Sequence, residues 1–333
     1  MPSAEKTGDE VVAPTAPAAT TPSIRLRSLG GWLAAIVRVH IKHVRITRRF
    51  PNILSPRRFT DKVEWRKLFD MNPLYTILSD KLAVRGFIAS RVGEQVLLPL
   101  IWSGTPEDIP FDRLRAPFVL KSNHASAQAI MIGADSEVRP HDLRRQATEW
   151  LQLCYGTLQD EPGYVGIPRR LLVERTVVRD DGSRPDELRF FVFDGKVAII
   201  NTVFPEAGRI RNGAFHTPEW KRLDWRFTRW VERDFPRPKR LSDMLRIAER
   251  LGEGIDFIRV DFYDCGERIY AGEMTVYPWS GLARFNPDAA DVVLGAYWRL
   301  KNPLRRALAA VLSGKREIVA PAAPAEAADR GTV

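Results

Sequence analysis

The stretch that most constrains the fold is residues 258–275, which read IRVDFYDCGERIYAGEMT. Two runs rich in β-branched and aromatic residues flank a DCGE turn, a pattern typical of a β-hairpin. Arg259, Asp261 and Glu273 interrupt these runs where a core strand would carry Val or Leu. Arg259 and Asp261 share one face, because strand side chains alternate. A turn of about three or five residues would pair Arg259 opposite Glu273 and bring all three together, whereas an even-length turn would scatter them.

Two carboxylates that converge beside an arginine carry an electrostatic cost unless a positive group lies between them. A hard cation such as Mg²⁺, itself bound to phosphate, relieves that cost. The alternative is a surface hairpin whose charges only face water. The hairpin therefore predicts either a phosphate-bound metal site or a solvated pair of strands.

Length and composition limit the other possibilities. A chain of 333 residues exceeds one ordinary core, so we expect two or three subdomains, and 44% apolar residues indicate a packed core. Cys154 and Cys265 lack metal-site spacing, and two cysteines form no disulfide framework, which favours a reducing cytoplasm. The net charge of +10 favours anionic partners such as nucleotides, acidic glycans or lipid headgroups. Net charge is the one argument for nucleic acid, so we expect no nucleic-acid partner.

The N-terminal part divides into two segments. Residues 1–23 are rich in Ala, Pro and Thr, which predicts a disordered leader, and the Ala/Pro tail 313–333 predicts the same. Residues 24–49 hold seven Arg and Lys and no acid, and predict a basic amphipathic helix too short in apolar length to cross a bilayer. Such a helix either lies on an anionic membrane at its inner face or docks its apolar side onto the domain.

Residues 59–93 predict two helices separated at Asn72-Pro73. Ser79 is a suitable N-cap for the second helix and Gly93 a suitable C-terminal glycine. Lys81 and Arg85 lie four residues apart on one face of that helix. On their own they would be a solvated pair.

A buried run, PFVLK, ends in Lys121 and is followed by small polar residues. A strand that delivers a lysine into a small-residue loop suits the phosphates of a nucleotide, because backbone N–H groups and the ammonium share the charge. Neither a Walker A nor a Rossmann pattern is present. We interpret His124 in this loop as a residue that shapes it, with a general base as the alternative.

The second half of the chain predicts further strands and helices. Residues 171–177 form a strand that carries Glu174, and residues 189–200 form a hairpin. Residues 201–238 show no clear period and predict a variable insert. Two helices follow, one from Ser242 to Gly252 and one from about residue 288 to 312 with a kink at Pro303.

The order of these motifs resembles the ATP-grasp superfamily. The residues within the motifs are most similar to its TupA-like branch, which is named for teichuronopeptide biosynthesis. The pieces that carry the resemblance are WRKLFDMNPLYTILSDKLAVR, PFVLKSNH, LRFFVFDGK, FIRVDFY and GEMTVYPWSG. The resemblance covers roughly residues 55 to 300. It implies an α+β fold in which ATP lies between two α+β subdomains, preceded by a helical N-terminal segment. The implied parts are an N-terminal region (50–115), a small subdomain (116–178) and a large one (179–312).

The resemblance also implies roles for single residues. Phosphate contacts would come from Lys81 and Lys121, with Ser122, Asn123 and His124 in the loop between strands. Glu174 would lie near the adenine and Glu187 near the ribose. Asp261, Glu273 and Thr275 would hold Mg²⁺, and Arg259, with Lys121, would be catalytic by steadying the acyl phosphate. Relatives carry glycines after the Asn-His, whereas this chain has Ala125 and Ala127, which resist positive φ.

The implied activity is an ATP- and Mg²⁺-dependent carboxylate–amine ligase in the biosynthesis of a cell-surface polysaccharide such as an exopolysaccharide. A carboxylate would attack the γ-phosphoryl group, and an amine would then displace phosphate. The alternative is a non-catalytic module that binds nucleotide or acidic glycan within a membrane-associated assembly. The loop alanines favour the alternative, whereas the intact lysines and carboxylates favour the ligase.

Overall fold

The computed structural model describes residues 24–25, 29–179, 181–206, 209–227, 230–312 and 317–318. The predicted leader and nearly all of the predicted tail lie outside these residues. Two short strands at the ends of the described chain, β1 (Ile24–Arg25) and β14 (Glu317–Ile318), pair antiparallel.

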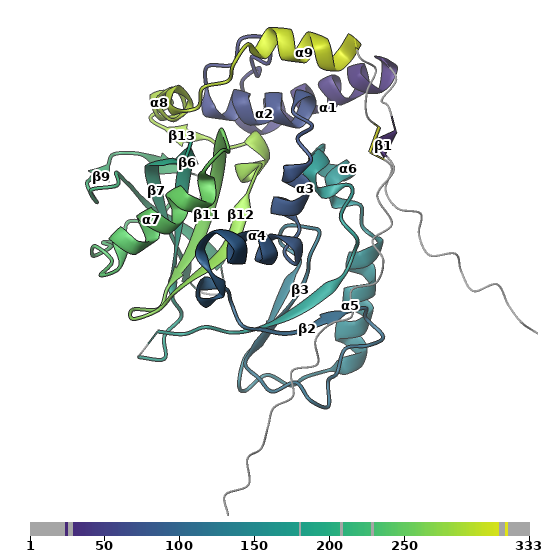
Figure 1. Cartoon of the computed structure of the whole chain (residues 1–333), viewed down its shortest axis with the longest axis vertical. Helices are drawn as coiled ribbons and strands as arrows, with labels where there is room; N and C mark the ends of the chain where they lie inside the picture. The colour runs from purple at the N-terminus through teal and green to yellow at the C-terminus, as the bar shows by residue number, and fades with distance from the viewer. Residues whose placement is uncertain are drawn as a thin grey trace, which may run out of the picture.

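A six-stranded antiparallel sheet forms one half of the molecule, in the order β12-β11-β6-β7-β8-β9 (Figure 1). Its strands are β6 (Asp186–Phe193), β7 (Lys196–Glu206), β8 (Arg209–His216), β9 (Arg222–Leu223), β11 (Phe257–Asp264) and β12 (Ile269–Thr275). Asp194 and Gly195 both have positive φ in the β6–β7 turn, which confirms the predicted hairpin. Helix α7 (Leu241–Gly252) packs its apolar side against β6, β7 and β11.

The predicted variable insert at 201–238 is wrong over its first part. Residues up to 206 continue β7, and β8 pairs with it as an interior strand of the sheet. The pairing register shifts between Asn201 and Val203, which breaks the alternation that would have revealed the strand. The helix at 241–252 starts at Leu241, and no side chain caps its first turn.

A four-stranded antiparallel sheet in the order β2-β5-β3-β4 forms the other half. Its strands are β2 (Leu100–Gly104), β3 (Phe118–Ser122), β4 (Ala129–Ile132) and β5 (Leu171–Arg175). Helix α5 (Pro140–Gln152) packs on β3, with Leu143 and Ala147 buried in a separate small core. Near it lie α6 (Tyr155–Gln159) and the 3₁₀ turn η2 (Pro162–Tyr164). The strands predicted around Lys121 and Glu174 are confirmed.

The region between the sheets holds three helices where the sequence predicted two: α2 (Phe59–Phe69), α3 (Leu74–Ser79) and α4 (Ala83–Val92). The break at Asn72-Pro73 is confirmed, and Gly93 ends α4 with φ 89°. Ser79 is the last residue of α3 rather than the cap of α4. The Asp80 carboxylate instead accepts the Leu82 N–H at 2.8 Å. The 3₁₀ turn η1 (Glu94–Val96) then leads to the small sheet.

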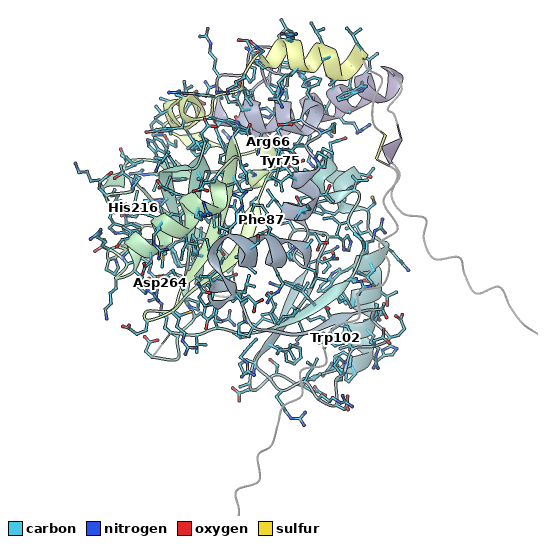
Figure 2. The ribbon with its side chains drawn as sticks, viewed as in Figure 1. Arg66, Tyr75, Phe87, Trp102, His216 and Asp264 are labelled. Atoms are coloured by element: carbon cyan, nitrogen blue, oxygen red, sulfur yellow. The ribbon has the colours of Figure 1, made fainter. Side chains whose placement is uncertain are left out.

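Every residue of α2 is buried, including its charged ones. Arg66 donates to the carbonyls of Phe257 and Val276 at 3.0 and 3.1 Å and pairs with Asp256 at 2.6 Å. Figure 2 shows Arg66 beside Tyr75, whose ring lies 4.8 Å from the guanidinium carbon. Lys62 donates to two carbonyls at the end of the helix α8 (Ala289–Tyr297). The charged side chains of α2 therefore anchor this helix to one end of the large sheet and to α8.

Helix α1 (Leu29–Thr47) lies beside α2 and under α9 (Pro303–Leu312) at the top of Figure 1. Trp32, Ala35 and Val39 are buried in a core shared with α2 and α9, so one side of α1 docks onto the domain as the second alternative predicted. The predicted single helix from 288 to 312 is wrong, because α8 and α9 are separate. Pro303 opens α9, where its missing N–H is tolerated. No helix among the described residues is long and apolar enough to cross a membrane.

Candidate active site

The charged hairpin is β11 and β12, and its register differs in one respect from the prediction. Asp264 pairs with Ile269, which leaves an even-length turn at residues 265–268. A bulge then shifts the register by one residue at Gly272, so Asp261 pairs with Glu273 and Arg259 pairs with Thr275. The predicted pairing of Arg259 with Glu273 is therefore wrong. The convergence of the charges on one face is confirmed. The even-length turn alone would place Asp261 and Glu273 on opposite faces, and the one-residue bulge returns them to the same face.

The charges continue across the sheet into a row that the sequence analysis did not anticipate. Arg189 on β6 pairs with Asp261 on β11, so the row runs Glu273, Asp261, Arg189. The guanidinium of Arg189 lies 2.5 Å from Glu187 and 3.8 Å from Asp261. Arg259 holds both oxygens of Asp261, at 2.7 and 2.6 Å, and donates to the Thr275 hydroxyl at 3.0 Å. The signal for Arg189 was its spacing of two residues from Glu187 on one strand.

Burial and charge act in opposite directions on the two carboxylates. Burial raises the pKa of Asp261 to about 6, although Arg259 and Arg189 pull it down. Burial also acts to raise the pKa of Glu273, but Lys81, then Arg259 and the other nearby cations, hold it below its ordinary value. Glu273 therefore stays ionised near neutral pH, beside a partner that protonates more readily.

Lys81 lies just before α4 and reaches toward Glu273. Its ammonium donates to the carbonyl of Ala125, and its backbone N–H donates to the carbonyl of Asn123 at 3.0 Å. Burial lowers the pKa of Lys81, against the attraction of Glu273. The segment that carries Lys81 is thus fastened to the loop after β3, as a shared phosphate site requires.

The loop after β3 is held by its own side chains. Ser122 is fully buried, and its hydroxyl donates to the Gln128 amide oxygen at 2.6 Å. Asn123 donates to Asp80 and to the Pro168 carbonyl, both at 2.9 Å, and accepts the Arg170 N–H. Ala127 adopts φ 61°, the left-handed conformation that alanine resists, so the loop holds this residue in a strained backbone conformation. Ser122 and Asn123 direct their side chains into the scaffold.

His124 is almost completely buried behind the same loop. One ring nitrogen, Nε2, lies 3.3 Å from the Leu153 carbonyl, while Nδ1 has no hydrogen-bond partner among the described residues. Burial, and then the charge of Arg169, lower the pKa of His124 to about 4. A neutral imidazole locked behind the loop agrees with a role in shaping it.

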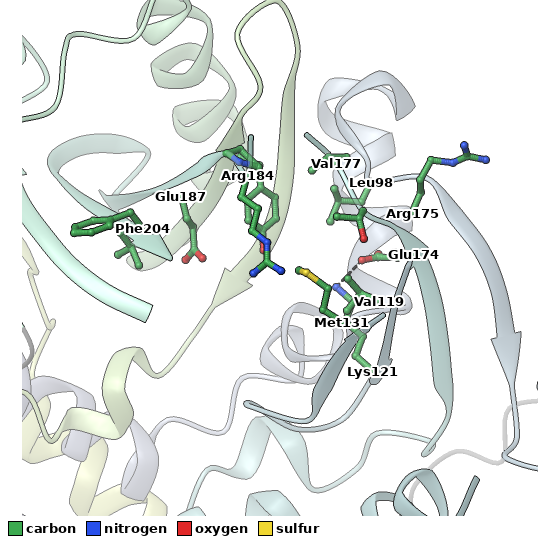
Figure 3. Close-up of a pocket in the computed structure, with 14 residues that line it drawn as sticks. Leu98, Val119, Lys121, Met131, Glu174, Arg175, Val177, Arg184, Glu187 and Phe204 are labelled. Carbon is green, nitrogen blue, oxygen red and sulfur yellow. Dashed lines mark ion pairs between the residues drawn. The ribbon is translucent and has the colours of Figure 1, made fainter. Parts of the chain in front are cut away.

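A cavity lies between the two sheets, with Lys121 at its edge (Figure 3). The Lys121 ammonium pairs with Glu174 at 2.5 Å, and Arg85 pairs with the same carboxylate at 3.2 Å. Glu187 reaches the cavity from the large sheet, opposite the pair. The remaining lining is largely apolar and also includes Arg175, Thr176 and Arg184. Its apolar residues are Leu98, Val119, Met131, Val177, Pro185, Val203, Phe204 and Tyr263. Such walls suit a flat ring with a charged end group.

A second cavity opens on the other side of the charged row. It is lined by Arg189, whereas the first is lined by Glu187, and the two side chains are ion-paired. The row of Glu273, Asp261 and Arg189 therefore touches the second cavity at Arg189 and the first through Glu187, the partner of Arg189.

A model of the family described as TupA-like ATPgrasp matches residues 61–299. The chain belongs to the TupA-like ATP-grasp family. Its fold is accordingly the α+β ATP-grasp fold with a helical segment before it, as the sequence resemblance implied.

Solved structures similar to this TupA-like protein are distant. An ADP complex of N5-carboxyaminoimidazole ribonucleotide synthetase is 12% identical, with a TM-score of 0.39 over 61% of this chain and 46% of that one. The ATP-grasp ligase PsnB, complexed with a precursor variant, Mg and ADP, is 10% identical, with a TM-score of 0.37 over 73% and 61%. D-alanine–D-alanine ligase from Bacillus anthracis, complexed with ATP, is 16% identical, with a TM-score of 0.39 over 71% and 67%.

The match thus spans about half to two thirds of the length of these solved structures. No curated protein matches the sequence.

In this TupA-like chain the predicted metal ligands lie together on β11 and β12. Within the described ranges, no group of three or more His, Cys, Asp or Glu side chains could hold a metal ion. Asp261 and Glu273 face each other and offer hard oxygen ligands, and the Thr275 hydroxyl lies two pairs further along on the same face. Two carboxylates suit a hard cation whose other ligands come from phosphate and water.

Proposed function

We propose that this protein is an ATP- and Mg²⁺-dependent ligase that joins a carboxylate to an amine through an acyl phosphate. The observation that carries the proposal is the charged row on β12, β11 and β6, whose end at Arg189 and its partner Glu187 lines two cavities. One cavity has apolar walls and a lysine at its edge. The other is rich in arginine. A reaction between a nucleotide and a carboxylate needs such a pair of sites with charge control between them.

The first cavity is the proposed nucleotide site. Its apolar walls would hold the adenine, with Glu174 as the nearby polar group, and Glu187 would bind the ribose. Lys121 and Lys81 would bind phosphate oxygens, and Lys121 would exchange its partner Glu174 for phosphate. Ser122, Asn123 and His124 would support the loop, whose backbone rather than their side chains would face the phosphates.

Asp261 and Glu273, with Thr275 beside them, would hold Mg²⁺, which neutralises phosphate charge when it is bound. Arg259 is held between Asp261 and Thr275, and its guanidinium would stabilise the acyl phosphate and the tetrahedral intermediate. In the first step an oxygen of the substrate carboxylate attacks the γ-phosphorus, and ADP leaves. In the second step the amine attacks the acyl carbon, the C–O bond to phosphate breaks, and the amine loses a proton.

ADP release tests this proposal. Purified protein is incubated with ATP and Mg²⁺ and with pairs of carboxylate and amine substrates, drawn from amino acids and uronic acids. We expect ADP release that requires both substrates and that Lys121→Ala abolishes nearly completely. Nucleotide binding without turnover across the whole set would favour the non-catalytic module instead.

We also propose that the protein works in cell-surface polysaccharide biosynthesis from the inner face of a membrane. The support is the exposed side of α1, where Leu33, Val37 and Ile41 are each more than half exposed and form one row. Arg45 lies on the neighbouring stripe and would face anionic headgroups, whereas Arg38 on the same stripe is ion-paired with Asp160. The membrane would bind the row of Leu33, Val37 and Ile41, which α1 does not use to pack against α2 and α9.

Vesicle flotation checks the membrane proposal. Removing α1 would expose the core that it shares with α2, so the variant is Leu33→Ser/Val37→Ser/Ile41→Ser. The control is Ile101→Ser, an exposed residue on β2 of the small sheet. We expect the full-length protein and the control to float with vesicles containing phosphatidylserine, and the triple variant to stay in solution. Equal flotation of all three proteins would contradict the proposal.

A further inference from the structure

The second cavity is built from five separate parts of the chain. Its lining comes from the end of α1, from β6, from β8, from the segment around β10 (Arg226–Phe227), and from the segment that runs from the 3₁₀ turn η3 (Pro278–Gly281) to β13 (Phe285–Asn286), which pairs with β10. Arg189, Arg226 and Arg284 supply three guanidinium groups, and no Asp or Glu is among the described lining residues. The nearest carboxylate to Arg226 is the exposed Asp224, at 3.8 Å. Arg189 is ion-paired with Glu187, so the positive charge of the cavity comes chiefly from Arg226 and Arg284.

Aromatic rings form much of the remaining wall. Trp279 lies 4.5 Å from Phe227 between ring centres, and both line the cavity. Trp230 also lines it, with the Arg226 guanidinium 4.7 Å from its ring. Flat apolar faces beside guanidinium groups suit a ligand that is both cyclic and anionic.

The position of Trp279 is fixed by unusual backbone geometry. Trp279 and Ser280 are consecutive non-glycine residues in the left-handed region, with φ 51° and 56°. The buried ammonium of Lys67 in α2 holds this turn, since it donates to the Ser280 carbonyl at 3.1 Å and to the Ser280 hydroxyl at 3.2 Å. Strained backbone that the surroundings hold in place commonly lies at binding sites.

The cavity is continuous with the proposed reaction centre. Arg189 lies in its wall and also 3.8 Å from Asp261. The guanidinium of Arg259 lies 5.8 Å from the ring of Trp279. A ligand on the tryptophan would therefore present its reacting group to Arg259 and Arg189, on the side away from the nucleotide cavity.

We propose that this cavity is the subsite for the carboxylate substrate, and that it binds an anionic sugar chain. Sugar rings would stack on Trp279, Phe227 and Trp230, and carboxylates would pair with Arg226 and Arg284. The inference rests on the proposed function and assigns one of its two substrates to a place. A protonated amine would be repelled by Arg226 and Arg284, so the amine must enter elsewhere. An acidic peptide would satisfy the arginines but would leave the aromatic faces without a ring partner.

Calorimetric titration without nucleotide tests this assignment. The probe is tri-galacturonic acid, with neutral maltotriose and tri-glutamate as comparison ligands. We expect tri-galacturonic acid to bind, maltotriose to show no binding, and tri-glutamate to bind at least about tenfold more weakly. Arg284→Ala and Arg226→Ala should each weaken binding about tenfold, because each removes a charge-assisted hydrogen bond. Arg145→Ala, an exposed arginine on α5, should leave binding unchanged.

Three results would overturn the assignment. They are no binding of tri-galacturonic acid, equal or tighter binding of tri-glutamate, and an equal loss of binding in Arg145→Ala. The proposed function fails independently, by absence of ADP release. Sugar binding that depends on Arg284 without any turnover would keep the subsite and reject the ligase.

Discussion

Charged residues are buried in two regions of this protein, and they differ in what they face. In α2, Lys62 and Arg66 donate to backbone carbonyls at the ends of helices and strands. In the cleft, Lys121, Arg189 and Arg259 are paired with side-chain carboxylates that line cavities or adjoin them. The first set completes hydrogen bonds of the fold. The second set is balanced only by other charges.

The comparison shows that burial of a charge does not by itself indicate function. A carbonyl at the end of a helix or strand is a fixed acceptor, so a cation bound to it is part of the scaffold. A carboxylate across a cavity is an acceptor that a phosphate can replace. Substitutions in the two regions should therefore separate stability from activity.

The largest effect is expected in α2. Arg66→Met should lower the free energy of unfolding by about 3–5 kcal/mol, because it leaves Asp256 and two buried carbonyls without their donor. Urea unfolding followed by tryptophan fluorescence measures this. The matched control is Arg246→Met, whose arginine is largely exposed, and it should change stability by less than about 1 kcal/mol. Similar free energies of unfolding for Arg66→Met and Arg246→Met would contradict the structural role assigned to the buried charges of α2.

The next effect concerns activity and not stability. Lys121→Ala should reduce ADP release about a hundredfold, or about 3 kcal/mol, because it removes a cation that faces developing phosphate charge. Its urea midpoint should stay close to that of the parent protein, since the lysine bonds to a replaceable partner. A large loss of stability with normal turnover per folded molecule would place Lys121 with the scaffold.

Glu273→Gln should separate metal binding from phosphate binding. The change keeps size and hydrogen bonding but removes a full negative charge from the proposed Mg²⁺ site, so binding of Mg²⁺ with ATP should weaken. Raising the Mg²⁺ concentration should restore part of the ADP release in Glu273→Gln and leave Lys121→Ala unrepaired. The measurement is an Mg²⁺ titration of both variants. Equal recovery of the two, or parent-like turnover in both without added Mg²⁺, would contradict the assignment.

The smallest effect concerns His124, whose pKa is lowered to about 4 by burial. An unfolded imidazole titrates near about 6.5, so the unfolded state binds more protons between the two values. The contribution of neutral His124 to the free energy of unfolding is thus complete above the unfolded pKa of about 6.5. It is lost as the pH falls toward the folded pKa of about 4. His124→Gln should therefore lose less stability between pH 7 and pH 5 than the parent, as urea midpoints would show. Its turnover at neutral pH should fall far less than that of Lys121→Ala, and an equal fall would favour the general base.

The sequence predicted the parts of this fold that local rules determine. The strand ending in Lys121, the turn at Asp194 and Gly195 and the end of α4 at Gly93 follow from alternation and from backbone preference. The candidate residues on β11 and β12 were also found, because charged side chains interrupt two runs that are otherwise rich in β-branched and aromatic residues. Their convergence depended on the turn length, which the sequence left open.

What the sequence could not predict depends on distant contacts. The pattern FTDKVEWRKLF suits an exposed helix. Helix α2 is nevertheless buried, because Lys62, Arg66 and Lys67 bond to residues between 256 and 298. Arg189 joins the site only through the pairing of β6 with β11. The arginine and tryptophan cavity gathers residues from 46 to 286, and no spacing in the chain connects them.

The bulge at Gly272 has a consequence for how this hairpin tolerates change. Side-chain orientation at Asp261 and Glu273 is set by pairs on one side of the bulge, and the turn lies on the other side. Residues could therefore be inserted at the exposed tip, or a reporter peptide grafted there, without rotating the charged side chains. The bulge itself has no such freedom, because a Cβ on Gly272 would come within 2.7 Å of the ring of Tyr263. The tip of the hairpin thus tolerates changes in length, whereas Gly272 at the bulge is needed to keep Asp261 and Glu273 on the same face.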